Sequence, residues 1–196
     1  MKIDTVILSS NDNPDYIQFW PIVSEAWTLM GVEPILLYTG EQKLNLKGNV
    51  INFYSKNIDS SFVAQNIRIL YPSLLDGNTC LVSDIDNLPL SKKYFINSVL
   101  DYENDSFIIY RPDACPPNMI SMMWNAANSS TWKEIFNIDS ERNIEKYLKK
   151  WYTKKYAIEG KAWYTDQIKL RKYVNKFSKK NKSRIVELDD TEMGFF

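Results

Sequence analysis

The chain contains no histidine among its 196 residues. This absence removes imidazole as a general base, a proton shuttle or a metal ligand. Any proton transfer therefore depends on other side chains, and carboxylates are the first candidates. A metal site would have to use oxygen ligands, which suit Mg²⁺ or Mn²⁺ rather than zinc.

Cysteine and long apolar runs are also scarce. Cys80 and Cys115 are too few for a disulfide framework, and Cys80 lies in an apolar run typical of a buried free thiol, which favours a reducing compartment. The N-terminus is too short and acid-interrupted for a signal peptide, and no apolar stretch is long enough to span a membrane. We therefore expect a cytoplasmic protein without a transmembrane segment.

Excess charge of either sign is absent, because 24 basic residues balance 24 acidic ones. A net charge of zero provides no global field to attract nucleic acid or an anionic membrane, so no nucleic-acid partner is expected. The basic run 169–184 is interpreted as a solvated helix face, with contact to phosphates or to an acidic partner as the alternative. Six scattered glycines form neither a P-loop nor a dinucleotide-binding fingerprint.

Short β-rich runs alternate with amphipathic stretches in the first half of the chain. Strands are predicted at 6–8, 34–38, 50–53 and 79–83, and helices at 14–30 and 60–70. Parallel strands need crossover connections, so this alternation predicts an α/β domain with a mostly parallel central sheet flanked by helices. Ligands bind beyond the carboxyl ends of the strands in such sheets.

The second half is less regular. The predicted elements are strands at 106–110 and 118–124 and helices at 131–136, 141–151 and 163–177. We expect a single domain over residues 1–196. The apolar end at 193–196 leaves two alternatives open: it folds back over the site, or the chain is one domain cut from a longer protein.

Two acidic residues follow the strand predicted at 79–83. Alternation along a strand directs Asp84 and Asp86 to one side and Ile85 to the other. The two carboxylates repel each other unless they are well solvated or a cation lies between them, and a divalent metal bound to a diphosphate meets that need. The alternative is a structural turn before Pro89, with Ser91 capping the next helix.

The flanks of this pair resemble a known family. Residues 62–72 and 80–90 are similar to the core of GT-A-fold glycosyltransferases, in which a helix carrying an Arg precedes an apolar strand that ends in a D-x-D motif. The small size is similar to minimal members, including domains encoded by large DNA viruses, and for a viral chain the expected location is the host cytoplasm. The resemblance implies a single GT-A-like domain that moves a hexosyl or deoxyhexosyl group from a nucleoside diphosphate sugar, with a UDP-sugar as the expected donor, to a hydroxyl of a glycan or glycoprotein acceptor.

The resemblance also implies roles for the acidic motif. Asp86 would chelate Mn²⁺ or Mg²⁺, while Asp84 would contact the metal, its hydration shell or the ribose of the donor, and Ile85 would lie in the same nucleotide-sugar site. Several branches of the family complete the metal shell with a late histidine. None exists here, so the third protein ligand stays open.

Other donor-binding roles follow from the same resemblance. Arg68 would face the nucleotide or its diphosphate, which a guanidinium can bind in a bidentate manner, and the alternative is a surface or sheet-edge arginine. Ser9 and Ser10 match the loop after the first strand, where the family places the nucleoside base. A plain polar loop is the alternative there.

A second candidate region begins at Trp163. If this region is helical, Asp166 lies on an otherwise apolar stripe, where an acid should be paired or functional. N-capping by Thr165 or Asp166 is the alternative. Similar segments lie beside the sugar in GT-A enzymes, which implies that Asp166 is the catalytic or acceptor-orienting carboxylate and that Gln167 binds donor hydroxyls. Asn125 is a further candidate for the sugar pocket.

The sequence leaves two rival functions open. A phosphatase of the haloacid-dehalogenase type would use Asp84 as nucleophile and Asp86 as general acid, with Asp189 and Asp190 as its late acidic pair. Leu88 stands where that family normally has Thr or Val. The second rival is a nucleotide-sugar binding module without turnover.

Overall fold

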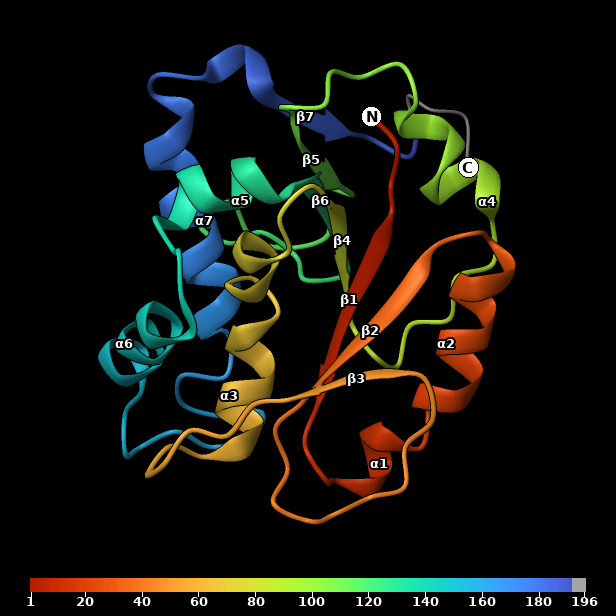
Figure 1. Ribbon diagram of the computed structural model, residues 1–196. Helices are drawn as coiled ribbons and strands as arrows, with labels where there is room; N and C mark the ends of the chain where they lie inside the picture. The colour runs from red at the N-terminus through yellow and green to blue at the C-terminus, as the bar shows by residue number, and fades with distance from the viewer. Residues whose placement is uncertain (192–196) are drawn as a thin grey trace.

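A seven-stranded sheet forms the centre of the protein (Figure 1). The structure is a computed structural model that describes residues 1–191, so the apolar end at 193–196 lies outside the described residues. The strands lie in the order β3-β2-β1-β4-β6-β5-β7. Their bounds are β1 Thr5–Ser10, β2 Glu33–Tyr38, β3 Asn49–Asn52, β4 Thr79–Ser83, β5 Phe107–Tyr110, β6 Trp124–Asn128 and β7 Ile185–Leu188.

The sheet is mostly parallel, as predicted. Strand β1 pairs in parallel with β2 and with β4, and β2 pairs in parallel with β3. Strand β5 pairs in parallel with β7. Only β6 runs against its two neighbours, β4 and β5. The carboxyl ends of β1 and β4 therefore lie side by side at one edge of the sheet, and the loops that follow them meet there.

Helices cover both faces of the sheet (Figure 1). The bounds are α1 Pro14–Ile17, α2 Trp20–Leu29, α3 Ser60–Ile67, α4 Lys92–Phe95, α5 Ser129–Phe136, α6 Glu141–Trp151 and α7 Thr165–Ser178. Short 3-10 helices occupy Tyr71–Leu74, Asn97–Val99 and Lys182–Arg184. Apolar residues of α3, α5, α6 and α7 pack into one core, and those of α2 and α4 into a second core on the opposite face.

Strand alternation divides the side chains between these two cores. Ile7 of β1 belongs to the core under α3, whereas its neighbours Val6 and Leu8 belong to the core under α2. All three are fully buried. A strand buried on both faces reads as a continuous apolar run, which is why the first strand was recognisable from sequence.

The helix predicted over 14–30 is wrong as a single element. It is two helices, α1 and α2, separated at Gln18 and Phe19. Pro21 lies in the first turn of α2, where a missing N–H costs nothing. In the interior of one continuous helix the same proline would remove a hydrogen bond to Ile17 and clash with its carbonyl, so the helix breaks instead.

The strand predicted over 118–124 is also misplaced. The strand is β6, which begins at Trp124, and residues 118–123 form turns and loop. Pairing with β4 begins where Ser83 lies opposite Trp124, because the chain leaves the sheet at Asp84. The apolar character of the methionines therefore reflects burial of a loop against the core: Met122 is 2% exposed.

Candidate functional site

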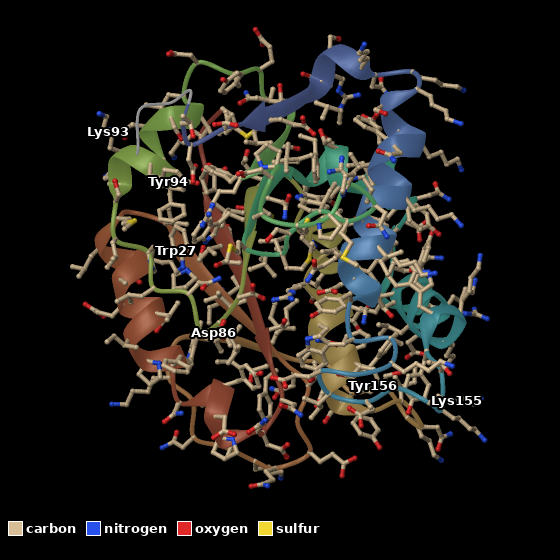
Figure 2. All side chains as sticks on the ribbon, turned by 180° about the vertical axis from the view of Figure 1, so that it is seen from behind. Trp27, Asp86, Lys93, Tyr94, Lys155 and Tyr156 are labelled. Carbon is tan, nitrogen blue, oxygen red and sulfur yellow. The ribbon has the colours of Figure 1, made fainter. Side chains whose placement is uncertain are left out.

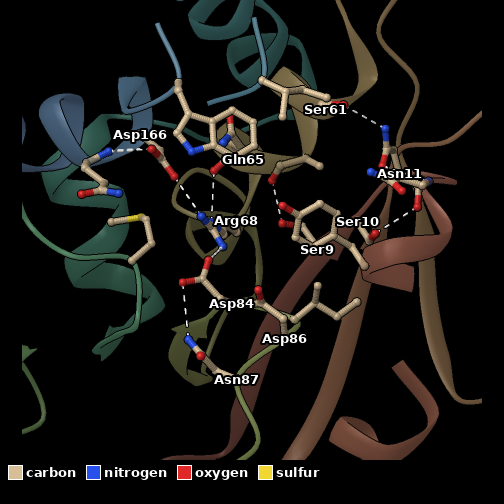
Figure 3. Close-up of a pocket in the computed structure, with 18 of the residues that line it drawn as sticks. Ser9, Ser10, Asn11, Ser61, Gln65, Arg68, Asp84, Asp86, Asn87 and Asp166 are labelled. Atoms are coloured by element: carbon tan, nitrogen blue, oxygen red, sulfur yellow. Dashed lines mark hydrogen bonds and ion pairs between the residues drawn. The ribbon is translucent and has the colours of Figure 1, made fainter. Parts of the chain in front are cut away.

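A cleft with a volume of about 340 Å³ lies beyond the carboxyl ends of β1 and β4 (Figure 3). Four groups of residues line it. They are the end of β1 with the following loop and α1 (Ser9, Ser10, Asn11, Asn13, Tyr16), α3 and its C-cap (Ser61, Ala64, Gln65, Arg68), the turn after β4 (Asp84, Ile85, Asp86, Asn87) and a second wall (Met122, Met123, Ile158, Trp163, Asp166, Gln167). The volume falls in the range of small-molecule sites. Every residue predicted for the site lines this cleft except Asn125.

Arg68 is the centre of the cleft's polar network. It follows α3 directly and is 7% exposed. Its Nη1 forms an ion pair with Asp84, its Nη2 lies 2.9 Å from Oδ2 of Asp166, and its Nε donates to the carbonyl of Gln65 at 3.2 Å. Burial alone would lower the pKa of Arg68, but the charges of Asp84 and Asp166 outweigh it and raise that pKa. The guanidinium thus bridges two acids, where the sequence predicted contact with a nucleotide or diphosphate.

Asp166 is almost completely buried in the opposite wall, with 2% of its surface exposed. Burial raises the pKa of its carboxyl, whereas Arg68 and the backbone N–H of Gln167 act to lower it. Both oxygens are engaged, since Oδ1 accepts from Gln167 N at 2.8 Å and Oδ2 binds Arg68. The capping alternative is not observed, because α7 begins after Tyr164 without a side-chain capping bond.

The acidic motif leaves the sheet as predicted. Ile85 is 4% exposed and packs into the core under α2, while Asp84 and Asp86 line the cleft. Asp84 lies between Arg68 and the amide of Asn87 (Figure 3). Asp86 is exposed and forms no ion pair with any residue of 1–191. Its pKa is raised, first by partial desolvation in the cleft and second by the charge of Asp84.

The turn interpretation of the motif holds at the same time. The N–H of Asn87 donates to the carbonyl of Asp84 at 3.3 Å, and Ser91 accepts from the N–H of Tyr94 at 3.2 Å as the N-cap of α4. The turn and the site are therefore compatible, since the turn is what directs the carboxylates of Asp84 and Asp86 into the cleft.

Oxygen ligands for a metal are present but few. Among residues 1–191 no group of three or more acidic or cysteine side chains converges on one point. Asp86 and the oxygen of Asp84 that faces away from Arg68 can supply two ligands, and the remaining positions would fall to phosphate and water. Mg²⁺ and Mn²⁺ are commonly bound in this way, so the donor set fits them.

The loop after β1 forms the other end of the cleft. Ser9 and Ser10 belong to the end of β1 itself, and the loop begins at Asn11. The hydroxyl of Ser9 donates to the carbonyl of Ala64 at 2.6 Å, so this serine also ties β1 to α3. Asn11 donates to the hydroxyls of Ser60 and Ser61 at 3.1 and 3.0 Å.

Tyr16 and Gln65 line the cleft but were not predicted from the sequence. Tyr16 on α1 reaches the cleft near Asp86, whose charge adds to burial in raising the pKa of the phenol. Gln65 accepts at 3.0 Å from the hydroxyl of Tyr156, and Tyr156 stacks on Trp163 with 6.2 Å between ring centroids. The position of Gln65 one turn before Arg68 on a helix was the available signal, since such residues share a face.

Asn125 lies behind the cleft rather than in it. It is fully buried in β6, and its amide donates to the carbonyl of Ser121 at 2.7 Å. Its Oδ1 has no hydrogen-bond partner among the described residues. The residue shapes the 121–123 loop, but its side chain does not reach the volume that a donor would occupy.

Solved structures share the architecture. The chain aligns with galactosyltransferase LgtC in complex with donor and acceptor sugar analogs, at a TM-score of 0.51 and 13% identity over 95% of this chain and 73% of LgtC. An active-site variant of LgtC gives a TM-score of 0.52 at 11% identity. Glycosyltransferase GlyE of Streptococcus pneumoniae TIGR4 gives 0.51 at 11% identity, over 97% of this chain and 46% of GlyE. The chain thus spans less than half of GlyE.

No protein-family model matches the sequence, and no curated protein matches it either. The likeness in structure is therefore a likeness of fold, and the chemistry has to be argued from the cleft.

Proposed function

We propose that this chain, which has the GT-A fold of glycosyltransferases, transfers a sugar from a nucleoside diphosphate sugar to an acceptor hydroxyl with the help of a divalent metal. The donor is expected to be a UDP-sugar carrying a hexosyl or deoxyhexosyl group, and the acceptor a glycan or glycoprotein. The cleft at the ends of β1 and β4 is the expected site.

The charge balance of the cleft is the observation that carries the proposal. Three carboxylates, those of Asp84, Asp86 and Asp166, face a single cation, Arg68, which leaves two negative charges in the cleft wall. A diphosphate would be repelled by this surface. One divalent cation at Asp84 and Asp86 removes that repulsion, which makes a metal a condition for donor binding rather than an addition to it.

The metal would supply electrophilic stabilisation of the diphosphate as it leaves. In the transfer step the bond between the anomeric carbon and the diphosphate oxygen breaks, and the acceptor oxygen forms the new bond to that carbon. The proton of the acceptor hydroxyl passes to an oxygen of the departing diphosphate, so that atoms and charge balance. Holding the hydroxyl close to the anomeric carbon in the cleft lowers the entropic part of the barrier.

Asp166 contributes to this step through its charge. Both of its oxygens already accept hydrogen bonds, from Gln167 and Arg68, so it is poorly placed to take a proton. A buried carboxylate beside the sugar instead stabilises the positive charge that develops on the ring in an oxocarbenium-like transition state. Arg68 favours the ionised form of Asp166, against the effect of burial on its pKa, and fixes its orientation.

The phosphatase alternative finds less support. Asp84 forms an ion pair with Arg68, which lowers the nucleophilicity of its carboxylate. The late acid Asp190 is buried elsewhere, where it accepts from the hydroxyl of Tyr94 at 2.6 Å and pairs with Arg111 at 3.1 Å. It is not among the residues that line the cleft. A binding module without turnover would share all of this geometry, so the two are separated by an assay of transfer.

Calorimetric titration of UDP with and without Mn²⁺ tests the donor site. We expect binding that requires the metal and is lost in Asp86→Ala but kept in Asp113→Ala, a matched control at an exposed aspartate outside the cleft. Release of UDP from a panel of UDP-sugars then tests turnover. Equal UDP affinity without metal, or in Asp86→Ala, would contradict the metal-dependent site, and GDP titrated in parallel tests the choice of base.

A further inference from the structure

The zero net charge of the chain conceals a strong separation of charge. Residues 142–184 contain fifteen Lys and Arg residues and three acidic ones, an excess of twelve positive charges in a chain whose total is zero. The rest of the chain is correspondingly acidic. The expectation that no field exists to attract an anionic surface therefore holds for the whole molecule but not for the part built from α6 and α7.

Lysines supply most of this excess and stand on the outer side of those helices. Lys150, Lys172 and Lys176 are exposed, and Lys169 lies 5.8 Å from the ring centroid of Trp151. Burial, followed by the charges of Lys172 and Lys150, lowers the pKa of Lys169, as expected where ammonium groups gather on one surface. We call Lys150, Lys169, Lys172 and Lys176 the lysine face. In Figure 2 nitrogen-tipped side chains line this outer side of α6 and α7.

Arginines in the same segment are mostly tied to the protein. Arg184 binds Glu134 at 2.9 Å and Asp105 at 3.1 Å, and Arg171 donates to the carbonyl of Met119 at 2.9 Å. The outward charge is thus carried by ammonium groups. These act as mobile point charges, which suit a diffuse anionic surface better than the planar, bidentate recognition of single phosphates by arginine.

Exposed apolar side chains continue the lysine face towards the cleft. Tyr164 is 49% exposed and Ile168 is 42% exposed, and the spacing of four residues between Tyr164, Ile168, Lys172 and Lys176 places them along one side of α7. Tyr164 directly follows Trp163 in the cleft wall. Lysines beside an exposed tyrosine and isoleucine match the composition of surfaces that bind at the lipid–water interface.

We propose that the lysine face, together with Tyr164 and Ile168, docks the protein on an anionic lipid bilayer. Charge complementarity selects this face, because the remainder of the molecule is acidic and is repelled by the same surface. The lysines are attracted to the headgroups and the two apolar side chains enter the interface. Docking in this orientation brings the Trp163 wall of the cleft close to the membrane. The inference is independent of the sugar chemistry proposed above.

Flotation of the full chain with vesicles tests the proposal. We expect binding to vesicles of phosphatidylcholine with phosphatidylserine, weakening at high salt, and no binding to phosphatidylcholine alone. Lys172→Glu combined with Lys176→Glu should lower the partition coefficient by about 25-fold or more, since each lysine near an anionic surface contributes about fivefold. The matched control is Lys43→Glu with Lys56→Glu, which makes the same change in net charge at two exposed lysines of the acidic part.

Several outcomes would overturn the proposal. Equal loss of binding in the control variant would assign the effect to net charge, and equal binding to neutral vesicles would remove the electrostatic basis. Ile168→Ser should weaken the binding that persists at high salt. If it does not, and a soluble polyanion such as heparin binds as tightly as the vesicles, the face recognises free polyanions instead. Thermal unfolding and UDP titration of each variant separate these results from misfolding and from failure of the donor site.

Discussion

Arg68 and Asp166 form a buried ion pair between residues 98 positions apart in the sequence, with Nη2 and Oδ2 separated by 2.9 Å. Arg68 binds Asp84 with its other terminal nitrogen. The end of α3, the turn after β4 and the start of α7 are thereby joined at one guanidinium. The same contact that holds these three elements together sets the charge of the cleft, so stability and function are coupled at this residue.

Replacement of Arg68 should be strongly destabilising. Arg68→Met removes the cation and leaves Asp166 buried and unpaired, for which we expect a loss of about 3–5 kcal/mol in the free energy of unfolding. Urea denaturation at neutral pH measures it. Lys149→Met is the control, because it breaks the exposed pair between Lys149 and Glu145 and should cost about 0.5 kcal/mol or less. Similar stabilities of the two variants would mean that the buried pair contributes little.

Asp166→Asn tests the role of charge in the cleft. The amide keeps the size of the side chain and one accepting oxygen but removes the negative charge. We expect kcat for sugar transfer to fall by about 100-fold or more, while the affinity for UDP with Mn²⁺ changes little. The assay should be run well below the melting temperature of the variant, because the buried pair with Arg68 is weakened. A variant with normal kcat would remove Asp166 from the mechanism.

Local patterns predicted much of the fold. The parallel strands β1, β2, β3 and β4 were recognisable because buried strands are short apolar runs separated by turn residues. Strand alternation predicted that Asp84 and Asp86 lie on one side and Ile85 on the other, and the turn that follows β4 keeps this arrangement. Ile85, which the resemblance placed in the nucleotide-sugar site, packs mainly into the core under α2. These features depend only on neighbours in sequence.

Features that depend on packing were not predictable in the same way. Asp166, the buried partner of Arg68, lies 98 residues further along the chain. No local pattern around Arg68 identifies it. Tyr16 reaches the cleft from α1, a short helix that ends before Pro21 at a break that the proline signalled and that periodicity obscured. Asn125 follows an apolar loop, but the register of β6 against β4 buries it.

The two cysteines should differ sharply in reactivity. Cys80 is fully buried in β4, and burial, followed by the charge of Asp4, raises the pKa of its thiol to about 12. Cys115 is half-buried, and burial raises the pKa of its thiol too. An aromatic disulfide reagent at neutral pH should therefore modify Cys115 in the folded protein and Cys80 only after unfolding. Cys115→Ser should leave no reactive thiol, and rapid modification of Cys80 in that variant would argue against a central position for β4.

Asp86→Asn should stabilise the metal-free protein at neutral pH. The pKa of Asp86 in the folded state lies above its ordinary value of 3.8, so the folded protein holds the proton more tightly than the unfolded chain does. This contribution to stability is present at low pH and is lost as the pH rises through the raised pKa, because the ionised carboxylate is then partly desolvated in the cleft and stands beside Asp84. At pH 7 the variant should gain about 0.5 kcal/mol or less, and the gain should vanish below pH 3.8.

Mn²⁺ should reverse the order of stability of the two proteins, since only the wild type gains binding energy from the metal. Denaturation curves with and without Mn²⁺ measure both effects, with Asp113→Asn as the exposed control. A metal-free variant less stable than the wild type at pH 7 would contradict an unfavourable environment for the ionised Asp86 carboxylate, and would weaken the charge argument for a metal.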